Sequence, residues 1–197
     1  DQDFLIETNK KILAFSKEGN PLLVTHNLVN ENNDAIINGF KQANISNDKT
    51  DRVKVIFYPS YLTGSEGLLD LPYYEAISGS HLGIFPSYYE PWGYTPLETA
   101  ASGVVSITTD LAGFGRFIEK SRDESNKQGI FVLKRYNKND EDVINNLTEY
   151  LHNFALLPRE ERVKLKIQAR NLAALADWKN LVVNYIKAHN LAIEKIY

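Results

Sequence analysis

Apolar residues along the chain form two kinds of pattern, helical repeats and short continuous runs. Helical spacing appears in residues 3–15 and again in residues 34–44, where Asp34 is a residue type that caps helices. Further helices are predicted at 72–78, 95–102, 114–120, 141–155, 158–176 and 178–195. Short apolar runs bounded by turn residues predict strands at 53–57, 81–85, 104–108 and 130–133. Residues 21–27, 62–71 and 86–94 are predicted to be extended chain or loops.

The order of these elements predicts the fold class. Strands alternate with helices between residues 53 and 155, which is typical of an α/β protein with a parallel, doubly wound sheet. The predicted strands are apolar throughout, as expected when helices cover both faces of the sheet. No strand is predicted after residue 133, so the last helices form a helical tail that we expect to pack on another domain.

Composition excludes several classes of protein. The 197 residues are 43% hydrophobic and 24% charged, as in ordinary globular domains, and the net charge of −3 gives no electrostatic footprint for nucleic acid. No apolar stretch approaches the roughly 20 residues that cross a bilayer, so no membrane span is expected. The absence of cysteine excludes disulfides and thiolate zinc sites and is compatible with a cytoplasmic location. The four histidines are too dispersed for a metal site.

The chain begins at Asp1 and contains no methionine. A whole gene product is expected to begin with methionine. We therefore expect this sequence to be a segment of a longer protein.

The densest chemistry follows the strand predicted at 81–85. Ligands of open parallel sheets bind beyond the carboxyl ends of the strands. Here Thr95 and Glu98 have the spacing of a capping box, with Pro96 at the first helical position and Gly93 before the cap. Free amides at 93–96 and the positive end of the helix dipole would form an anion site suited to a diphosphate without a metal. The alternative is an ordinary, well-formed helix start.

Glu90 lies in the same loop, between aromatic residues and prolines. It precedes Glu98 by eight positions, so that one carboxylate can face a sugar and the other a different hydroxyl-bearing group. The alternative for Glu90 is a solvated loop acid.

These residues resemble a known family. The string HLGIFPSYYEPWGYTPLETAASGVVSITTDLAGFG, beginning at His81, is similar to the donor-site signature of eukaryotic-type glycogen synthases, glycosyltransferase family 3. Segments at 25–34, 51–62 and 174–195 resemble the same family in the same order. The resemblance covers most of residues 20–195.

The resemblance implies a GT-B fold, in which the active site lies between two Rossmann-like domains. By this reading, residues 1–156 are a Rossmann-like nucleotide-sugar-binding domain that is incomplete at its N-terminus, and residues 157–197 are a helical segment that packs toward the N-terminal domain. The family transfers glucose from UDP-glucose to the 4-hydroxyl of an α-1,4-glucan with retention of configuration. No metal or cofactor is expected, and a homo-oligomer is left open.

The resemblance also assigns roles to residues. Glu90 becomes the catalytic candidate beside the transferred glucose, and Glu98 is placed on the ribose hydroxyls. The sugar and diphosphate are held, largely through backbone amides, by Trp92, Gly93, Tyr94 and Thr95. Tyr61 and Tyr73 fall where the family places aromatic residues around the uracil, although both are also compatible with ordinary semi-buried tyrosines.

The resemblance weakens in the regulatory region. The family carries an arginine-rich helix that binds glucose 6-phosphate, and the matching stretch here keeps Arg159, Arg162 and Lys166 among acidic residues. His81 matches a further effector position. The alternative is an exposed helix face with an i,i+4 pair between Glu160 and Lys164. The arginine and lysine that bind the donor phosphates in the family have no candidate here, so the isolated chain is expected to be inactive.

The sequence has two other interpretations, a dinucleotide-binding motif and a non-catalytic module. Gly113 and Gly115 follow a strand as in a dinucleotide motif, but Ile118 replaces the third glycine. A non-catalytic glucan-binding or assembly module with the same fold is the main alternative function, and the presence of both Glu90 and Glu98 favours the enzyme.

Overall fold

The computed structural model describes residues 22–121 and 128–195, and the helix predicted at 3–15 lies outside them. The chain divides into two compact units between Tyr73 and Tyr74. Each unit is described by itself.

Residues 22–73, the described part of the first unit, contain little regular structure. The 3₁₀ helix η1 (Glu31–Asn33) leads into α2 (Ala35–Gln42). Asp34 caps α2 as predicted, because its carboxylate accepts hydrogen bonds from the amides of Ile36 and Ile37 at 2.9 Å.

The prediction of a strand at 53–57 is wrong, because the structure has no strand there. Phe57 forms a single parallel bridge with Val24. Val55 is instead held by the buried side chain of Asn47, which donates to its carbonyl at 2.7 Å and accepts from its amide at 2.8 Å. An amide side chain therefore satisfies the backbone groups that a neighbouring strand would have paired, and Ile56 stays exposed.

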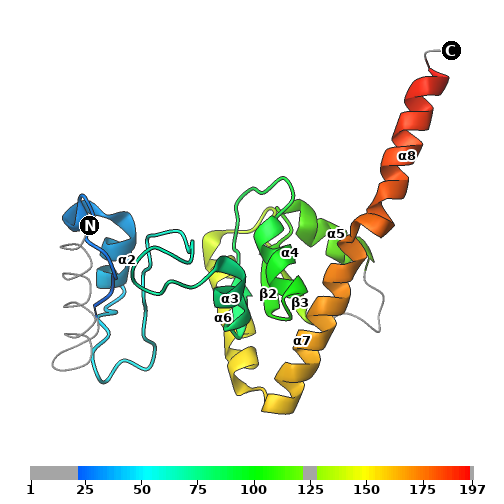
Figure 1. Cartoon of the computed structure of the whole chain (residues 1–197). Coiled ribbons are helices and arrows are strands. Elements are labelled where there is room, and N and C mark those ends of the chain that lie inside the picture. Colours follow the sequence, from blue (N-terminus) through cyan, green and yellow to red (C-terminus); the bar gives the residue numbers. More distant parts are fainter. Residues whose placement is uncertain (1–21, 122–127, 196–197) are drawn as a thin grey trace. The chain divides into compact units, whose positions relative to one another are not determined.

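The second unit contains a three-stranded parallel sheet in the order β1-β2-β3 (Figure 1). Its strands are β1 (Leu82–Ile84), β2 (Val105–Thr109) and β3 (Ile130–Leu133). Leu82 lies opposite Val105, and Ser106 lies opposite Ile130. The crossovers are α4 (Tyr94–Ala101) and α5 (Gly113–Ser121). The predicted α/β fold with a parallel sheet is confirmed, and it is consistent with a Rossmann-like half of a GT-B protein.

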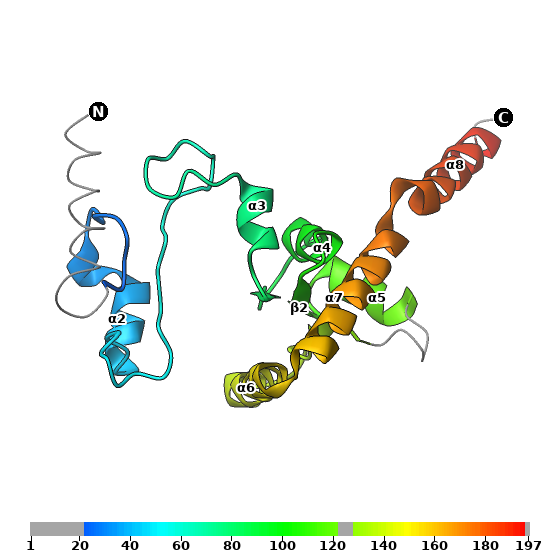
Figure 2. The ribbon, with the colours of Figure 1, turned by 60° about the horizontal axis from the view of Figure 1, so that its bottom comes forward.

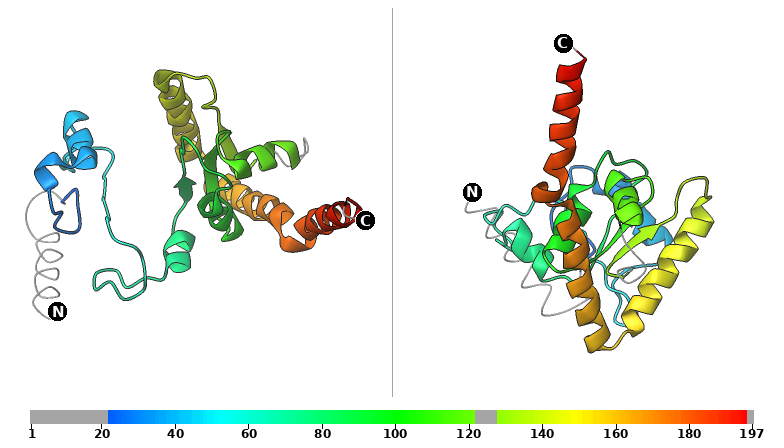
Figure 3. Two further views of the ribbon diagram at one scale, coloured as in Figure 1. Left: turned by 90° about the horizontal axis from the view of Figure 1, so that it is seen from above. Right: turned by 90° about the vertical axis from the view of Figure 1, so that its right-hand side faces the viewer.

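Helices cover both faces of the sheet, as the apolar strands predict. On one face, α4, α5 and α7 (Arg159–Ala173) bury a core that includes Phe114, Ile130 and Leu172. On the other, α6 (Asp140–Leu156) packs Val143 on Ile107 and Leu133. Figure 3 shows α6 and α7 on opposite sides of the strands, and Figure 2 shows α4, α5 and α7 grouped around β2.

The helices predicted at 72–78 and 178–195 match their observed ranges closely, whereas the helix predicted at 158–176 divides into α7 and a 3₁₀ helix. α3 (Tyr73–Ser78) precedes β1, and η3 (Ala174–Ala176) follows α7. The last helix, α8 (Trp178–Glu194), has no buried residue. No helix among the described residues is both long enough and apolar enough to cross a membrane.

Candidate functional site

The loop after β1 is fixed at the carboxyl end of the sheet. We call residues 86–93 the site loop. The Glu90 amide donates to the Leu111 carbonyl at 3.3 Å, and the Gly113 amide donates to the Glu90 carbonyl at 3.1 Å. A Cβ at Gly113 would lie 2.2 Å from the carbonyl oxygen of Pro91, so this close approach requires glycine. The backbone of Glu90 is therefore held against the segment that follows β2, and the residue is half-buried.

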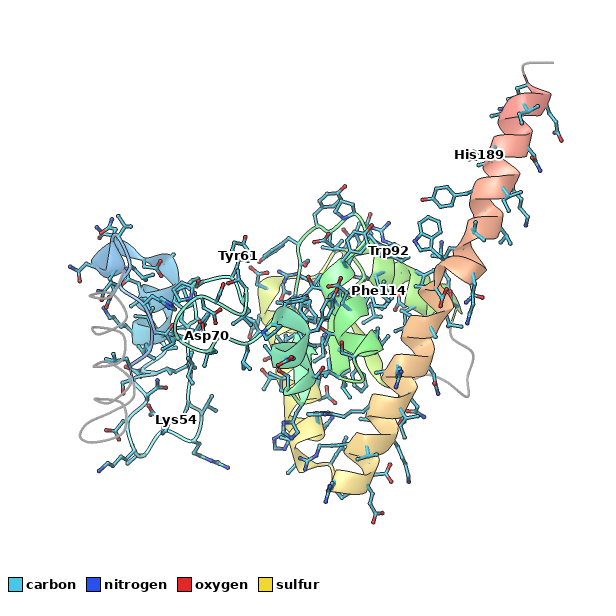
Figure 4. All side chains as sticks on the ribbon, viewed as in Figure 1. Lys54, Tyr61, Asp70, Trp92, Phe114 and His189 are labelled. Carbon is cyan, nitrogen blue, oxygen red and sulfur yellow. The ribbon has the colours of Figure 1, made fainter. Side chains whose placement is uncertain are left out.

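Trp92 anchors the site loop to the core. Its ring centroid lies 5.9 Å from that of Phe114 and 5.5 Å from that of Phe117, and its carbonyl accepts a hydrogen bond from the Phe114 amide at 2.6 Å. Figure 4 shows the labelled Trp92 and Phe114 near the start of α4. The indole is therefore half-buried against the core, and the ligand role predicted for Trp92 stays a prediction.

The start of α4 differs from the predicted capping box. Gly93 is the N-cap, with φ of 108°, and no side chain caps the helix. Thr95 and Pro96 therefore lie inside the first turn, and the prediction that Thr95 and Glu98 cap each other is wrong. The physical reason is that glycine tolerates the left-handed conformation that turns the chain into the helix one residue before Tyr94.

This start leaves donors exposed. The amides of Tyr94 and Thr95 have no acceptor among the residues that the structure describes. Pro96 has no amide hydrogen, so the predicted set of donors at 93–96 is reduced by one. The two amides and the helix dipole still form an end at which negative charge is stabilised, and they follow Glu90 by four and five residues.

Glu98 has a partner that the sequence did not predict. The Tyr74 hydroxyl donates to a carboxylate oxygen of Glu98 at 3.0 Å. This hydrogen bond, together with the negative charge of Glu98, raises the pKa of Tyr74. The sequence does not indicate which of the adjacent residues Tyr73 and Tyr74 contacts Glu98, because the answer depends on how α3 packs against α4.

The two predicted uracil-binding residues, Tyr61 and Tyr73, belong to the first unit, whereas Glu90 belongs to the second. Tyr61 is 92% exposed, whereas Tyr73 is half-buried. The roles of both stay predictions.

The predicted effector residues share one face of α7. Arg159, Arg162 and Lys166 have the i, i+3, i+7 spacing of a single helix face. The Lys166 ammonium donates to the Ser80 carbonyl at 3.2 Å, immediately before His81. Lys164 pairs with Glu161 at 2.7 Å instead of with Glu160. The structure therefore brings Lys166 to the segment of His81, while Glu161 pairs with Lys164 along the helix.

No group of three or more metal-binding side chains occurs within residues 22–121 and 128–195.

The site loop and the α4 start combine a carboxylate, exposed amides and a positive helix end. This arrangement can bind an anionic group and place a carboxylate beside a neighbouring electrophilic centre.

Comparisons with known proteins agree on one family. The family model described as glycogen synthase matches residues 1–197. A glycogen [starch] synthase of Neurospora crassa is 38% identical over 188 residues, which are 95% of this chain and 27% of the relative. Glycogen [starch] synthase isoform 2 of Saccharomyces cerevisiae is 40% identical over 192 residues, which are 95% of this chain and 27% of that relative. The human liver glycogen [starch] synthase is 35% identical over 197 residues, which are 100% of this chain and 28% of that relative. The chain thus spans about a quarter of the length of these relatives.

Proposed function

Because the chain belongs to the glycogen synthase family, we propose that it forms the donor-binding part of a retaining glucosyltransferase. The donor is UDP-glucose, and the acceptor is the 4-hydroxyl of an α-1,4-glucan. One structural observation carries the proposal: Gly93 begins α4 so that the amides of Tyr94 and Thr95 lack acceptors among the described residues, four and five positions after Glu90.

The reaction breaks the bond between the anomeric carbon and the diphosphate oxygen. The electron pair leaves with UDP, and the glucose acquires positive charge at its ring. The amides and dipole at the start of α4 stabilise the charge that develops on the diphosphate. The glucan hydroxyl then bonds to the anomeric carbon on the face that UDP leaves, and its proton passes to the departing diphosphate oxygen.

Glu90 stabilises the positive charge of the sugar from its fixed position in the site loop. Two roles fit this position, a nucleophile that forms a glycosyl-enzyme and a carboxylate that supports attack on the same face. Both roles require the negative charge and the placement of the carboxylate, and both predict loss of transfer when the charge is removed.

The other assigned residues bind the nucleotide and an effector. Glu98 accepts hydrogen bonds from the ribose, and Tyr61 and Tyr73 contact the uracil. His81, Arg159, Arg162 and Lys166 bind a sugar phosphate, which the shared helix face and the Lys166–Ser80 hydrogen bond support. The glucan and an N-terminal Rossmann-like domain complete the active site, which needs no metal.

The test replaces Glu90 in the complete synthase. Glu90→Gln keeps the size of the side chain and removes its charge, so we expect kcat to fall by at least about 1,000-fold with an unchanged melting temperature. Transfer is measured as glucose incorporated into glycogen from labelled UDP-glucose. Glu75→Gln, in exposed helix α3, is the control and should retain transfer. Turnover of Glu90→Gln near the wild-type rate would exclude Glu90 from the mechanism.

A further inference from the structure

Arg135 connects the segment after β3 to the site loop. It lies two residues beyond Leu133, the end of β3, and its guanidinium donates to the Pro86 carbonyl at 2.9 Å. The same guanidinium lies 3.6 Å from the ring centroid of Tyr88. Only 8% of the Arg135 side chain is exposed. An almost buried cation is thus committed to the first half of the site loop.

These contacts hold the loop through the cation. A hydrogen bond from a charged donor is roughly twice as strong as a neutral one. A guanidinium over an aromatic face adds a smaller attraction, because the Tyr88 ring is itself exposed. The ion pair of Arg135 with Asp140 contributes little, because its atoms are 3.5 Å apart and the Asp140 side chain is 72% exposed. Asp140 also accepts from the Tyr88 hydroxyl at 3.1 Å, which fixes the ring that Arg135 covers.

The backbone of Arg135 is also fixed by hydrogen bonds. A carboxylate oxygen of Asp110 accepts hydrogen bonds from the amides of Arg135 and Tyr136 at 2.8 and 3.2 Å. The Asp110 amide donates to the Leu133 carbonyl at 3.2 Å. Arg135 therefore connects the ends of β2 and β3 to the loop that follows β1.

The two halves of the site loop have separate supports. Arg135 and the Thr109 hydroxyl, which donates to the Ser87 carbonyl at 2.9 Å, hold residues 86–88. Backbone hydrogen bonds to residues 111–114 hold Glu90 and Trp92. The second support holds the backbone of Glu90 and leads to the amides of Tyr94 and Thr95. Residues 86–88, which lead into Glu90, depend on the first support.

We propose that Arg135 is a positioning residue that fixes the first half of the site loop and thereby aims Glu90 at the transferred sugar. Its catalytic consequence rests on the function proposed above. Arg135 acts through the loop, because its guanidinium is nearly inaccessible to a solute. Its removal should therefore impair transfer and leave binding of the nucleotide diphosphate intact.

The test compares Arg135→Ala with Lys134→Gln in the complete synthase. Both changes remove one positive charge, but the Lys134 side chain is 53% exposed and pairs with Glu119 outside the site loop. In Arg135→Ala, we expect amide hydrogen exchange of residues 87–90 to become at least about 10-fold faster. We expect kcat to fall by about 100-fold and the Kd of UDP to change by less than about 3-fold. Millimolar ethylguanidinium should restore part of kcat, whereas Lys134→Gln should behave as wild type.

Three results would overturn the inference. They are unchanged exchange of the loop in Arg135→Ala, an unchanged kcat, or a loss of UDP affinity as large as the loss of kcat without rescue, which would indicate a general structural role. The proposed function fails separately. If the wild-type synthase neither binds UDP nor transfers glucose, that function is overturned together with the catalytic consequence, while faster exchange in Arg135→Ala would still support the hold of Arg135 on the loop.

Discussion

At the scale of single residues, the site depends on side chains whose partners come from elsewhere in the fold. Glu98 was predicted from its spacing to Glu90, but Tyr74, which donates to it, was not. Arg135 was missed in the same way, because a basic residue after a strand has no distinctive spacing. Spacing within one loop predicts residues that act together, but it gives no information on contacts between segments that follow different strands.

The Tyr74–Glu98 pair makes a prediction about recognition of the ribose. If Tyr74 orients the carboxylate that accepts from the ribose, Tyr74→Phe should weaken UDP binding by at least about 10-fold, the lower end of the effect of losing one hydrogen bond to a charged group. Binding of 2′-deoxy-UDP should change less. Titration calorimetry with both nucleotides measures the difference. Equal losses for the two ligands would show that Tyr74 does not act through the ribose.

The same pair has a defined dependence on pH. Because Glu98 raises the pKa of Tyr74, the neutral hydroxyl is favoured in the folded protein. The contribution of Tyr74 to stability is therefore complete below the ordinary tyrosine pKa of about 10, and it is lost as the pH rises through the higher folded value. Binding of UDP should be insensitive to Tyr74 ionisation at neutral pH.

At the scale of elements, the sequence predicted the strands of the second unit and most of its helices to within about two residues, but it predicted one helix at 158–176 where α7 ends at Ala173 and η3 follows. These segments carry their own signals, because a strand buried on both faces is apolar throughout and a surface helix is periodic. The run at 53–57 has the same local signal and forms no strand, since Asn47 takes the place of a pairing partner. Local pattern cannot distinguish a strand with a partner from an apolar segment without one.

Gly93 makes a prediction at this scale, with Gly103 as a matched control. Both glycines have positive φ, 108° and 76°, so alanine at either position should cost about 1–2 kcal/mol of stability. A Cβ at Gly93 would lie 3.2 Å from Pro96 and 3.5 Å from Glu90, whereas nothing lies within 4 Å of one at Gly103. Gly93→Ala should therefore move the first amides of α4 and weaken UDP at least about 10-fold.

Gly103→Ala should lose similar stability and keep its affinity for UDP. Chemical denaturation and titration calorimetry of the two variants provide the comparison. Equal affinities for UDP in Gly93→Ala and Gly103→Ala would contradict the role of the α4 amides in binding the diphosphate. A larger loss for the glucan than for UDP in Gly93→Ala would contradict it as well.

At the scale of the whole molecule, α8 exposes apolar side chains, and we propose that a further partner covers them. The helix has no buried residue, yet its exposed side chains include Trp178, Val183, Tyr185 and Ile186. An apolar helix face of this kind is stabilised by packing against another surface. The proposed partner is the N-terminal Rossmann-like domain, which agrees with a chain that spans about a quarter of its relatives.

The last prediction concerns the isolated chain. It contains the α4 start and Glu90, but the proposed acceptor site and the second domain lie outside it. We therefore expect residues 1–197 alone to bind UDP weakly and to transfer no detectable glucose to glycogen. Calorimetry measures the first property, and incorporation of labelled glucose measures the second. Circular dichroism verifies that the chain is folded, and Gly93→Val supplies the matched variant that should not bind UDP. Transfer by the isolated chain would show that one domain suffices, and a folded chain without UDP affinity would favour a non-catalytic module.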